Sequence, residues 1–196
     1  TLGSAFVRGR DMVAIARPYM RQLTEASGET SNLAIRRDDQ AVYISQIESS
    51  ATIRAFSKLG DRVPLTCSGV GLALLLMDSD QTLTGLLYRT GLPVRTPKSL
   101  DTPEKLEDVL RLGRQRGFVI DDEAHALGMR CVASPIFDTE GEIVSAVSIS
   151  GPSARLTESR VLELGSLVAR TARKITYRIG GRAPAGFSES VPVETA

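Results

Sequence analysis

Residues 129–150, MRCVASPIFDTEGEIVSAVSIS, decide the fold class. Met129–Phe137 and Glu142–Ser150 have the composition of β-strands. The tetrapeptide between them, Asp138-Thr139-Glu140-Gly141, is rich in residues that favour turns. Two strands joined by so short a turn form a hairpin, whereas a parallel sheet needs strand–helix–strand units. This segment therefore favours an antiparallel sheet.

Further strands are expected on the N-terminal side of this hairpin. Phe118–Ile120 has strand composition, and Asn32–Arg37 and Ala41–Glu48 alternate in polarity around Asp38-Asp39-Gln40, which predicts a second hairpin. We expect another strand at Thr52–Ser57. These segments bring the total to about six strands.

Several helices accompany these strands. The clearest periodicity follows Thr157, where apolar residues recur at steps of three and four and predict one buried helix face. The expected helices are Asp11–Ser27, Ser68–Met77, a helix from Ser79 to Gly91, one from Thr102 to Gly117 and one from Thr157 to Ile179. Pro18 should either bend the first of these or mark a later start for it. Hairpins combined with separate helices indicate the α+β class. We expect one domain over residues 1–180 and a mobile tail over residues 181–196.

The composition limits the possible functions. The chain has 196 residues, with 24 Lys and Arg against 23 Asp and Glu, and a net charge of +1. Nucleic-acid-binding domains usually carry a strong basic excess, so the composition does not place this chain directly on DNA or RNA. No apolar stretch reaches the ~20 residues of a membrane-spanning helix, and we expect no membrane partner. Two cysteines cannot build a disulfide framework and favour a reducing cytoplasm.

Three clusters contain residues suited to ligand binding or catalysis. The first is Cys67-Ser68-Gly69-Val70-Gly71, at the start of an expected helix. Free N–H groups and the helix dipole at such a start suit a carboxylate or phosphate. The glycines equally allow close packing of a buried helix. A nucleotide-binding P-loop is excluded, because Leu72 follows Gly71 where that motif has lysine.

The second cluster is Asp121-Asp122-Glu123-Ala124-His125, followed by Cys131. A cysteine nucleophile with a histidine base, or a metal site of Asp, His and Cys, can be imagined from these residue types. A histidine in a polar loop is more often solvated, and a single cysteine in a strand is more often a small apolar filler.

The third cluster is Ser148-Ile149-Ser150, in which two hydroxyl groups point to the same face of a strand. If that face is covered by helices, the hydroxyls need partners. If it faces solvent, they are simply hydrated. Periodicity does not decide, because Val147 and Ile149 could equally be the core residues.

Taken in order, these segments resemble the C-terminal effector-binding domain of the IclR family of bacterial transcription regulators, from about Leu2 to Ile179. The order and spacing of the matching stretches carry the resemblance, since no single stretch is diagnostic. The clearest are Gly28-Glu29-Thr30, Val42-Tyr43-Ile44, Ser68-Gly69-Val70-Gly71, Arg116-Gly117-Phe118, Asp121-Asp122-Glu123, Gly128-Met129-Arg130-Cys131, Ala133-Ser134-Pro135 and Ser148-Ile149-Ser150-Gly151-Pro152. The resemblance implies a GAF-like fold: a curved antiparallel sheet of about six strands, flanked by helices, with a small-molecule pocket.

The branch of the family that responds to glyoxylate and pyruvate is most similar. For this chain the resemblance implies that a small organic acid is held by groups from all three clusters. The implied effector-binding residues are Gly69, Val70, Asp121, Cys131, Ser148 and Ser150, and the implied apolar walls are Ala55, Val63 and Met129. Leu72 stands where many members have lysine, and Ala55 is small, so both leave the identity of the effector open.

The resemblance implies a sensor that is not an enzyme and that needs no cofactor and no metal. It further implies self-association into dimers and tetramers, and binding to DNA only through an N-terminal winged helix-turn-helix domain that this sequence does not include. Two alternatives stay open. One is a GAF-like cysteine-dependent enzyme using Cys131 and His125, and the other is a purely structural oligomerisation domain.

Overall fold

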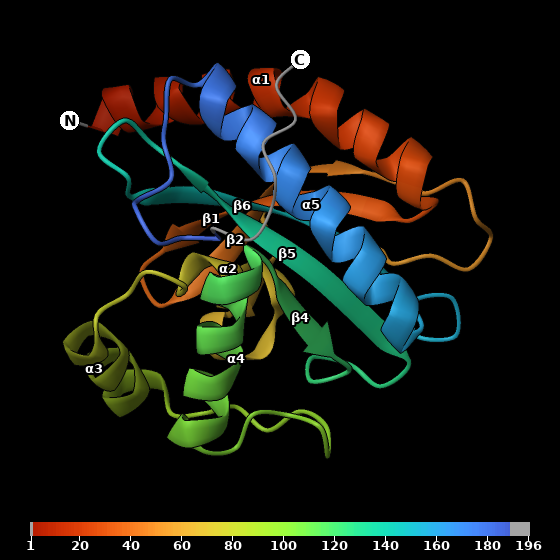
Figure 1. Cartoon of the computed structure of the whole chain (residues 1–196), viewed down its shortest axis with the longest axis vertical. Helices are drawn as coiled ribbons and strands as arrows, with labels where there is room; N and C mark the ends of the chain where they lie inside the picture. Colours follow the sequence, from red (N-terminus) through yellow and green to blue (C-terminus); the bar gives the residue numbers. More distant parts are fainter. Residues whose placement is uncertain (1, 189–196) are drawn as a thin grey trace.

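The computed structural model describes residues 2–188 of the chain, with side chains from residue 11 onward. A single sheet runs in the order β3-β2-β1-β6-β5-β4, and all neighbouring strands in it are antiparallel (Figure 1). The strands are β1 (Thr30–Arg37), β2 (Gln40–Ile47), β3 (Arg62–Pro64), β4 (Val119–Asp122), β5 (Met129–Phe137) and β6 (Ile143–Pro152). The helices are α1 (Leu2–Ser27), α2 (Gly69–Leu74), α3 (Asp80–Thr90), α4 (Pro103–Arg116) and α5 (Glu158–Arg178), with a 3-10 turn at Leu65–Cys67. The predicted α+β class with a curved antiparallel sheet is confirmed.

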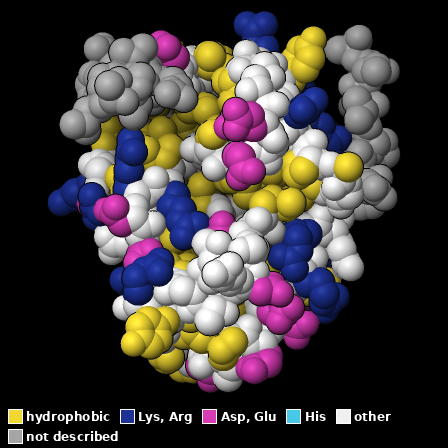
Figure 2. Space-filling model, turned by 90° about the vertical axis from the view of Figure 1, so that its left-hand side faces the viewer, with side chains coloured by type: hydrophobic (Ala, Val, Ile, Leu, Met, Phe, Trp, Pro, Cys, Tyr) yellow, Lys and Arg dark blue, Asp and Glu magenta, His cyan; other side chains and the backbone are white. Residues whose placement is uncertain are grey.

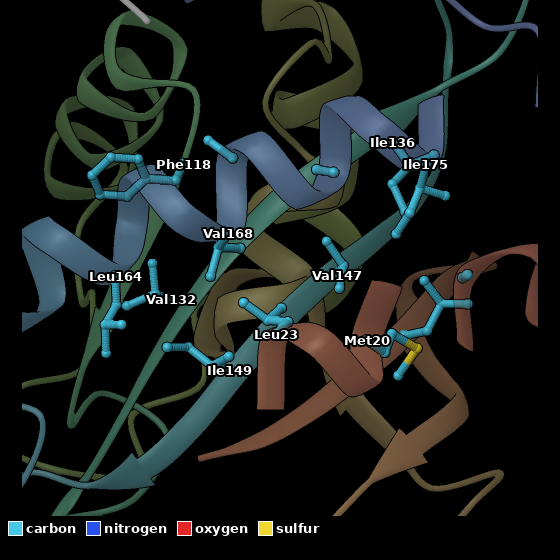
Figure 3. Close-up of a cluster of buried hydrophobic side chains, with 14 of the residues drawn as sticks. Met20, Leu23, Phe118, Val132, Ile136, Val147, Ile149, Leu164, Val168 and Ile175 are labelled. Atoms are coloured by element: carbon cyan, nitrogen blue, oxygen red, sulfur yellow. The ribbon is translucent and has the colours of Figure 1, made fainter. Parts of the chain in front are cut away.

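Helices cover both faces of the sheet. On one face, α1 and α5 bury an apolar cluster that Figure 3 shows in close-up. Its labelled members include Met20 and Leu23 of α1, Val147 and Ile149 of β6, and Leu164, Val168 and Ile175 of α5. On the other face, α2 and α4 pack against small residues of the central strands, among them Ala34, Ala133 and Ala146. The small side chains allow the short helix α2 to lie close to the sheet.

One expected strand is wrong. Residues 52–57 have no regular structure, and the strand that pairs with β2 is instead Arg62–Pro64. The apolar residues of this stretch do not mark a buried strand face, because the side chains of Ile53 and Phe56 are 71% and 62% exposed. Only Ala55 of this stretch is buried, and its carbonyl accepts a hydrogen bond from Thr30 Oγ1 at 2.9 Å.

The ends of several elements also differ from expectation. Helix α1 extends back to Leu2 and contains Pro18 in its interior, rather than starting at Asp11. Helix α2 is shorter than the expected Ser68–Met77 and ends at Leu74. Thr157 does occupy the N-cap of α5, but its side chain makes no capping hydrogen bond and lies 3.3 Å from Ser159 Oγ.

The segment after α5 was expected to be a mobile tail. Residues 181–188 instead return to the domain, where the Phe187 ring makes an edge-to-face contact with Phe137 at 4.9 Å. The Ser188 amide donates a hydrogen bond to the Arg114 carbonyl at 3.1 Å. Residues 189–196 of the expected tail lie outside the described part of the chain.

The surface carries both signs of charge. Lys and Arg side chains are interspersed with Asp and Glu over the face that Figure 2 shows, and over the whole chain their numbers nearly balance, at 24 against 23. Within residues 2–188, no helix has both the length and the apolar composition needed to cross a bilayer.

Candidate functional site

The sheet face under α2 carries a group of polar side chains at its centre. Strand pairing sets Asp121 of β4 beside Cys131 of β5, and Cys131 beside Ser150 of β6. Ser148, two residues before Ser150 on the same face, pairs with Asn32 of β1. Four neighbouring strands therefore bring these five side chains together on one face.

Two of these side chains carry buried oxygen atoms without a partner. Asn32 is 1% exposed and Ser148 is 0% exposed. Within residues 2–188, neither Asn32 Oδ1 nor Ser148 Oγ has a hydrogen-bond partner. Most buried polar groups in proteins are paired, and an unpaired one costs about 1–3 kcal/mol. Two such atoms on paired residues mark this place as unusual within the core.

Helix α2 closes the site from above. A Cβ atom added to Gly69 would overlap the Cys131 Sγ and lie 3.0 Å from the Cys131 Cβ, so only glycine fits at this position. Val70, the next residue, is fully buried in the apolar cluster on this face. The start of α2 is held in place by Ser68, whose Oγ accepts a hydrogen bond from the Gly71 amide at 3.2 Å.

Burial shifts the titratable groups of the site toward their neutral forms. It raises the pKa of the Cys131 thiol to about 12, and the nearby Asp121 carboxyl adds to the shift. It also raises the pKa of Asp121 above the ordinary value of an aspartate. The backbone N–H groups of Ala124 and His125 oppose that shift, because they donate to Asp121 Oδ1 at 2.8 and 3.3 Å. Burial likewise raises the pKa of the Tyr43 hydroxyl, and negative charge on the nearby Cys131 or Asp121 raises it further.

A catalytic cysteine–histidine pair is not assembled. His125 Nδ1 lies 2.8 Å from the Cys67 carbonyl oxygen, so its ring is engaged with the backbone before α2. Nucleophilic cysteines have a lowered pKa, whereas that of Cys131 is raised. The Cys67 thiol donates to the Ala124 carbonyl at 3.2 Å. Within residues 2–188, no group of three or more His, Cys, Asp or Glu side chains is placed to hold a metal ion.

The three expected wall residues lie in different elements around this face. Val63 of β3 is buried in the same apolar cluster as Val70. Met129 is half-buried on β5, two residues before Cys131 and on the same face. The Ala55 carbonyl accepts a hydrogen bond from Thr30, whose partner across the sheet is Ser150. Leu72 is buried in the core.

Two hollows of the surface lie elsewhere. One, of about 380 Å³, lies beside the β1–β2 turn and includes Asp39, Arg62 and Thr90. The other, of about 320 Å³, lies between β5, α5 and the returning segment at Phe187. Neither hollow is lined by any of the six predicted effector-binding residues. At the centre of the predicted site, Gly69, Ser148 and Asn32 are buried.

Sequence reasoning missed Asn32 and Tyr43. Both lie on strands of the first predicted hairpin, and their partners across the sheet are on β6 and β1. A usable signal was present for Asn32. It stands two residues before Ala34 in a predicted strand, so a polar amide and a small apolar side chain share one face of that strand. Tyr43 carried no comparable signal, since tyrosine is common in strands.

Comparisons with known proteins agree on one family. The family model described as "Bacterial transcriptional regulator IclR C-terminal" matches residues 4–177. The acetate operon repressor of Salmonella typhimurium is 43% identical over 182 residues, which cover 92% of this chain and 66% of the repressor. The HTH-type transcriptional repressor AllR of Escherichia coli K12 is 44% identical over 183 residues, covering 93% of this chain and 67% of AllR. The chain therefore spans about two thirds of the length of these curated relatives, and they are named as repressors, not as enzymes.

Solved structures of similar proteins have the same fold. IclR of Thermotoga maritima superimposes with a TM-score of 0.83 at 30% identity, over 91% of this chain and 72% of that chain. The C-terminal domain of the E. coli regulator KdgR superimposes with a TM-score of 0.77 at 30% identity, over 87% of this chain and 99% of that chain.

Proposed function

This chain belongs to the IclR family of bacterial transcriptional regulators, over the family's C-terminal domain, and we propose that it senses a small carboxylate of the glyoxylate or pyruvate type. In this proposal the effector binds on the sheet face under α2. The contacting groups are the six residues that the resemblance implies: Gly69, Val70, Asp121, Cys131, Ser148 and Ser150.

The observation that carries the proposal is the pair of buried, unpartnered oxygen atoms of Asn32 and Ser148. The rest of this face is lined by small apolar residues such as Ala34, Ala133 and Ala146, which need no partner. A purely structural core would gain stability by replacing Asn32 and Ser148 with apolar residues. Their presence supports a site whose hydrogen bonds are completed by a ligand.

The charges of the site favour a weakly held, small acid. The grouped residues contain hydroxyl and thiol donors but no lysine or arginine, so an effector carboxylate would accept neutral hydrogen bonds instead of forming an ion pair. Ionised Asp121 would repel a carboxylate, and its raised pKa reduces that repulsion. Binding should therefore be modest and should tighten as the pH falls.

We infer that effector binding changes the assembly of the regulator. In this proposal the domain pairs into dimers and tetramers, and the effector shifts the population of an arrangement that binds DNA. Contact with DNA belongs to a helix-turn-helix segment outside this sequence, as the name of AllR indicates for that relative. Such a regulator works where the DNA is, which for a bacterium is the cytoplasm.

Titration calorimetry with glyoxylate and pyruvate tests the proposal. Ser148→Ala should weaken binding by about 0.5–3 kcal/mol, depending on whether the lost partner is neutral or charged. The matched control is Ser50→Ala, because Ser50 is an exposed serine in the loop after β2, and its affinity should equal that of the unmodified chain. Equal affinity in Ser148→Ala, or no heat from any short acid, would leave the proposal without support.

Thermal unfolding separates this proposal from a structural oligomerisation domain. An acid at a hundred times its dissociation constant should add about 2.7 kcal/mol to the free energy of unfolding. A chain that self-associates but is stabilised by no short acid would favour the structural alternative. Conversion of an acid to a product, lost in Cys131→Ser, would instead favour the enzyme alternative.

A further inference from the structure

We propose that Asn32 is the specificity-determining residue of this site and selects acids that carry a hydroxyl group on the carbon next to the carboxylate. This class includes 2-hydroxy acids and 2-oxo acids in their hydrated form, and it excludes 2-oxo acids in their keto form. The inference rests on the proposed function, because it concerns the same site, and it goes further by naming the feature of the ligand that is recognised.

The position of Asn32 is the first support. It lies on β1, in the middle of the sheet, with its Cα opposite that of Ser148 on β6. Its neighbours in sequence are occupied elsewhere: the Ser31 hydroxyl donates to the Met20 carbonyl of α1 at 3.0 Å, and Leu33 is buried under α1 and α5. Asn32 therefore points to the opposite face, toward α2, where the predicted effector-binding residues lie.

The chemistry of the unpartnered atom is the second support. Asn32 Oδ1 is a carbonyl oxygen, which can only accept a hydrogen bond. A carboxylate oxygen and a keto oxygen are also acceptors, so neither can satisfy it. A ligand hydroxyl can, because it brings its own hydrogen.

Three other polar groups of the site are hydrogen-bond donors, in contrast to Asn32 Oδ1. The thiol of Cys131 stays protonated, and the strand register places the hydroxyls of Ser148 and Ser150 on the same face of the sheet as its sulfur. All three are donors suited to the ligand's carboxylate. Adjacent strands lie about 4.8 Å apart. The acceptor Asn32 Oδ1 on β1 and the donor hydroxyl of Ser148 on β6 are therefore close enough for groups on two adjacent ligand carbons to reach both. A 2-hydroxy acid has a donor and an acceptor group on such carbons.

The experiment compares lactate with pyruvate, because the two acids have the same carbon skeleton and differ in the hydroxyl and keto groups. Calorimetry on the unmodified chain should give at least about fivefold tighter binding for one enantiomer of lactate than for pyruvate. In Asn32→Leu, which has a similar size and no polar atom, this preference should disappear while the affinity for pyruvate changes less than about twofold. Asn32→Val, whose branched side chain suits a strand and has no polar atom, is the second variant and should also lose the preference.

The outcomes separate this inference from the proposed function. If the unmodified chain binds both acids equally, or prefers pyruvate, Asn32 does not accept a ligand hydroxyl and the inference is overturned, while the carboxylate site stands. A preference for lactate that survives in folded Asn32→Leu or Asn32→Val overturns it as well. If the unmodified chain binds no short acid of either kind, the proposed function and the inference fall together.

Discussion

Replacing Gly69 with alanine should test the geometry at the centre of the site. The new Cβ would overlap the Cys131 Sγ and lie 3.0 Å from the Cys131 Cβ, whereas carbon atoms in contact prefer about 3.5–4.0 Å. Both residues are buried, so neither can move into solvent. Overpacking of this kind typically costs about 1–3 kcal/mol, which for a chain of this size lowers Tm by roughly 2–4 °C for each kcal/mol.

A double-mutant cycle identifies the atom responsible. Cys131→Ala removes Sγ, so Gly69→Ala should cost less in the Cys131→Ala background than its expected ~2 kcal/mol in the unmodified chain. Gly85→Ala is the matched control, because Gly85 is also helical and its added Cβ meets only the flexible end of Arg89, at 3.3 Å. That change should be neutral or should stabilise by up to about 1 kcal/mol.

Urea unfolding followed by circular dichroism measures all four free energies of the cycle. The reasoning is refuted if Gly69→Ala costs no more than Gly85→Ala, since α2 would then not lie against Cys131. It is refuted equally if the cost is the same with and without the Cys131 sulfur.

Three further outcomes are expected. Burial raises the pKa of Asp121 in the folded chain, so the stability that this carboxyl contributes is present below the ordinary aspartate pKa and is lost as the pH rises through the folded value. Asp121→Asn should therefore gain stability relative to the unmodified chain between pH 4 and pH 7. A difference in unfolding free energy that stays constant with pH, measured in urea, would contradict this. Arg155→Met should cost about 3 kcal/mol in the same assay, because it leaves the carboxylate of Glu29, which is 1% exposed, without its bidentate partner at 2.7 and 2.8 Å. The control Arg54→Met breaks an exposed ion pair with Glu48 and should cost at most about 1 kcal/mol. Equal losses of unfolding free energy in the two variants would contradict the stabilising role of the Arg155–Glu29 pair. Finally, the chain at micromolar concentration should sediment as a dimer or larger species, and a pure monomer would count against the proposed assembly.

The sequence predicted most of the elements because their signals are local. Thr102 and Pro103 mark the start of α4, and Gly117, with a φ of 80°, marks its end. The failure at residues 52–57 has the opposite cause. The true edge strand, Arg62–Pro64, is three residues long and ends in proline, so neither its length nor its composition distinguishes it from a turn. Its position depends on pairing with β2, which no short window of sequence contains.

The candidate site was harder to predict because both faces of the sheet are covered. Alternation in β6 left two interpretations open, with the face of Ser148 and Ser150 either covered by helices or exposed to solvent. The structure places Val147 and Ile149 under α1 and α5, and it buries Ser148 under α2. A sheet covered on both sides has no solvent face at its centre, so polarity alone could not assign one. The family resemblance, in contrast, grouped these serines with Cys131, and the strand register brings them together.

Strand β1 shows how a site for a few atoms can affect the rest of the domain. On one face, Ser31 accepts a hydrogen bond from Thr24 Oγ1 at 2.8 Å and donates one to the Met20 carbonyl, so the strand is fixed to α1. On the other face, Asn32 lies among the predicted effector-binding residues. Since the core on both sides is closely packed, a shift of Asn32 cannot be absorbed by empty space. A ligand that completes the hydrogen bond of Asn32 therefore acts one residue from the attachment of α1, and its binding energy can favour one position of that helix over another.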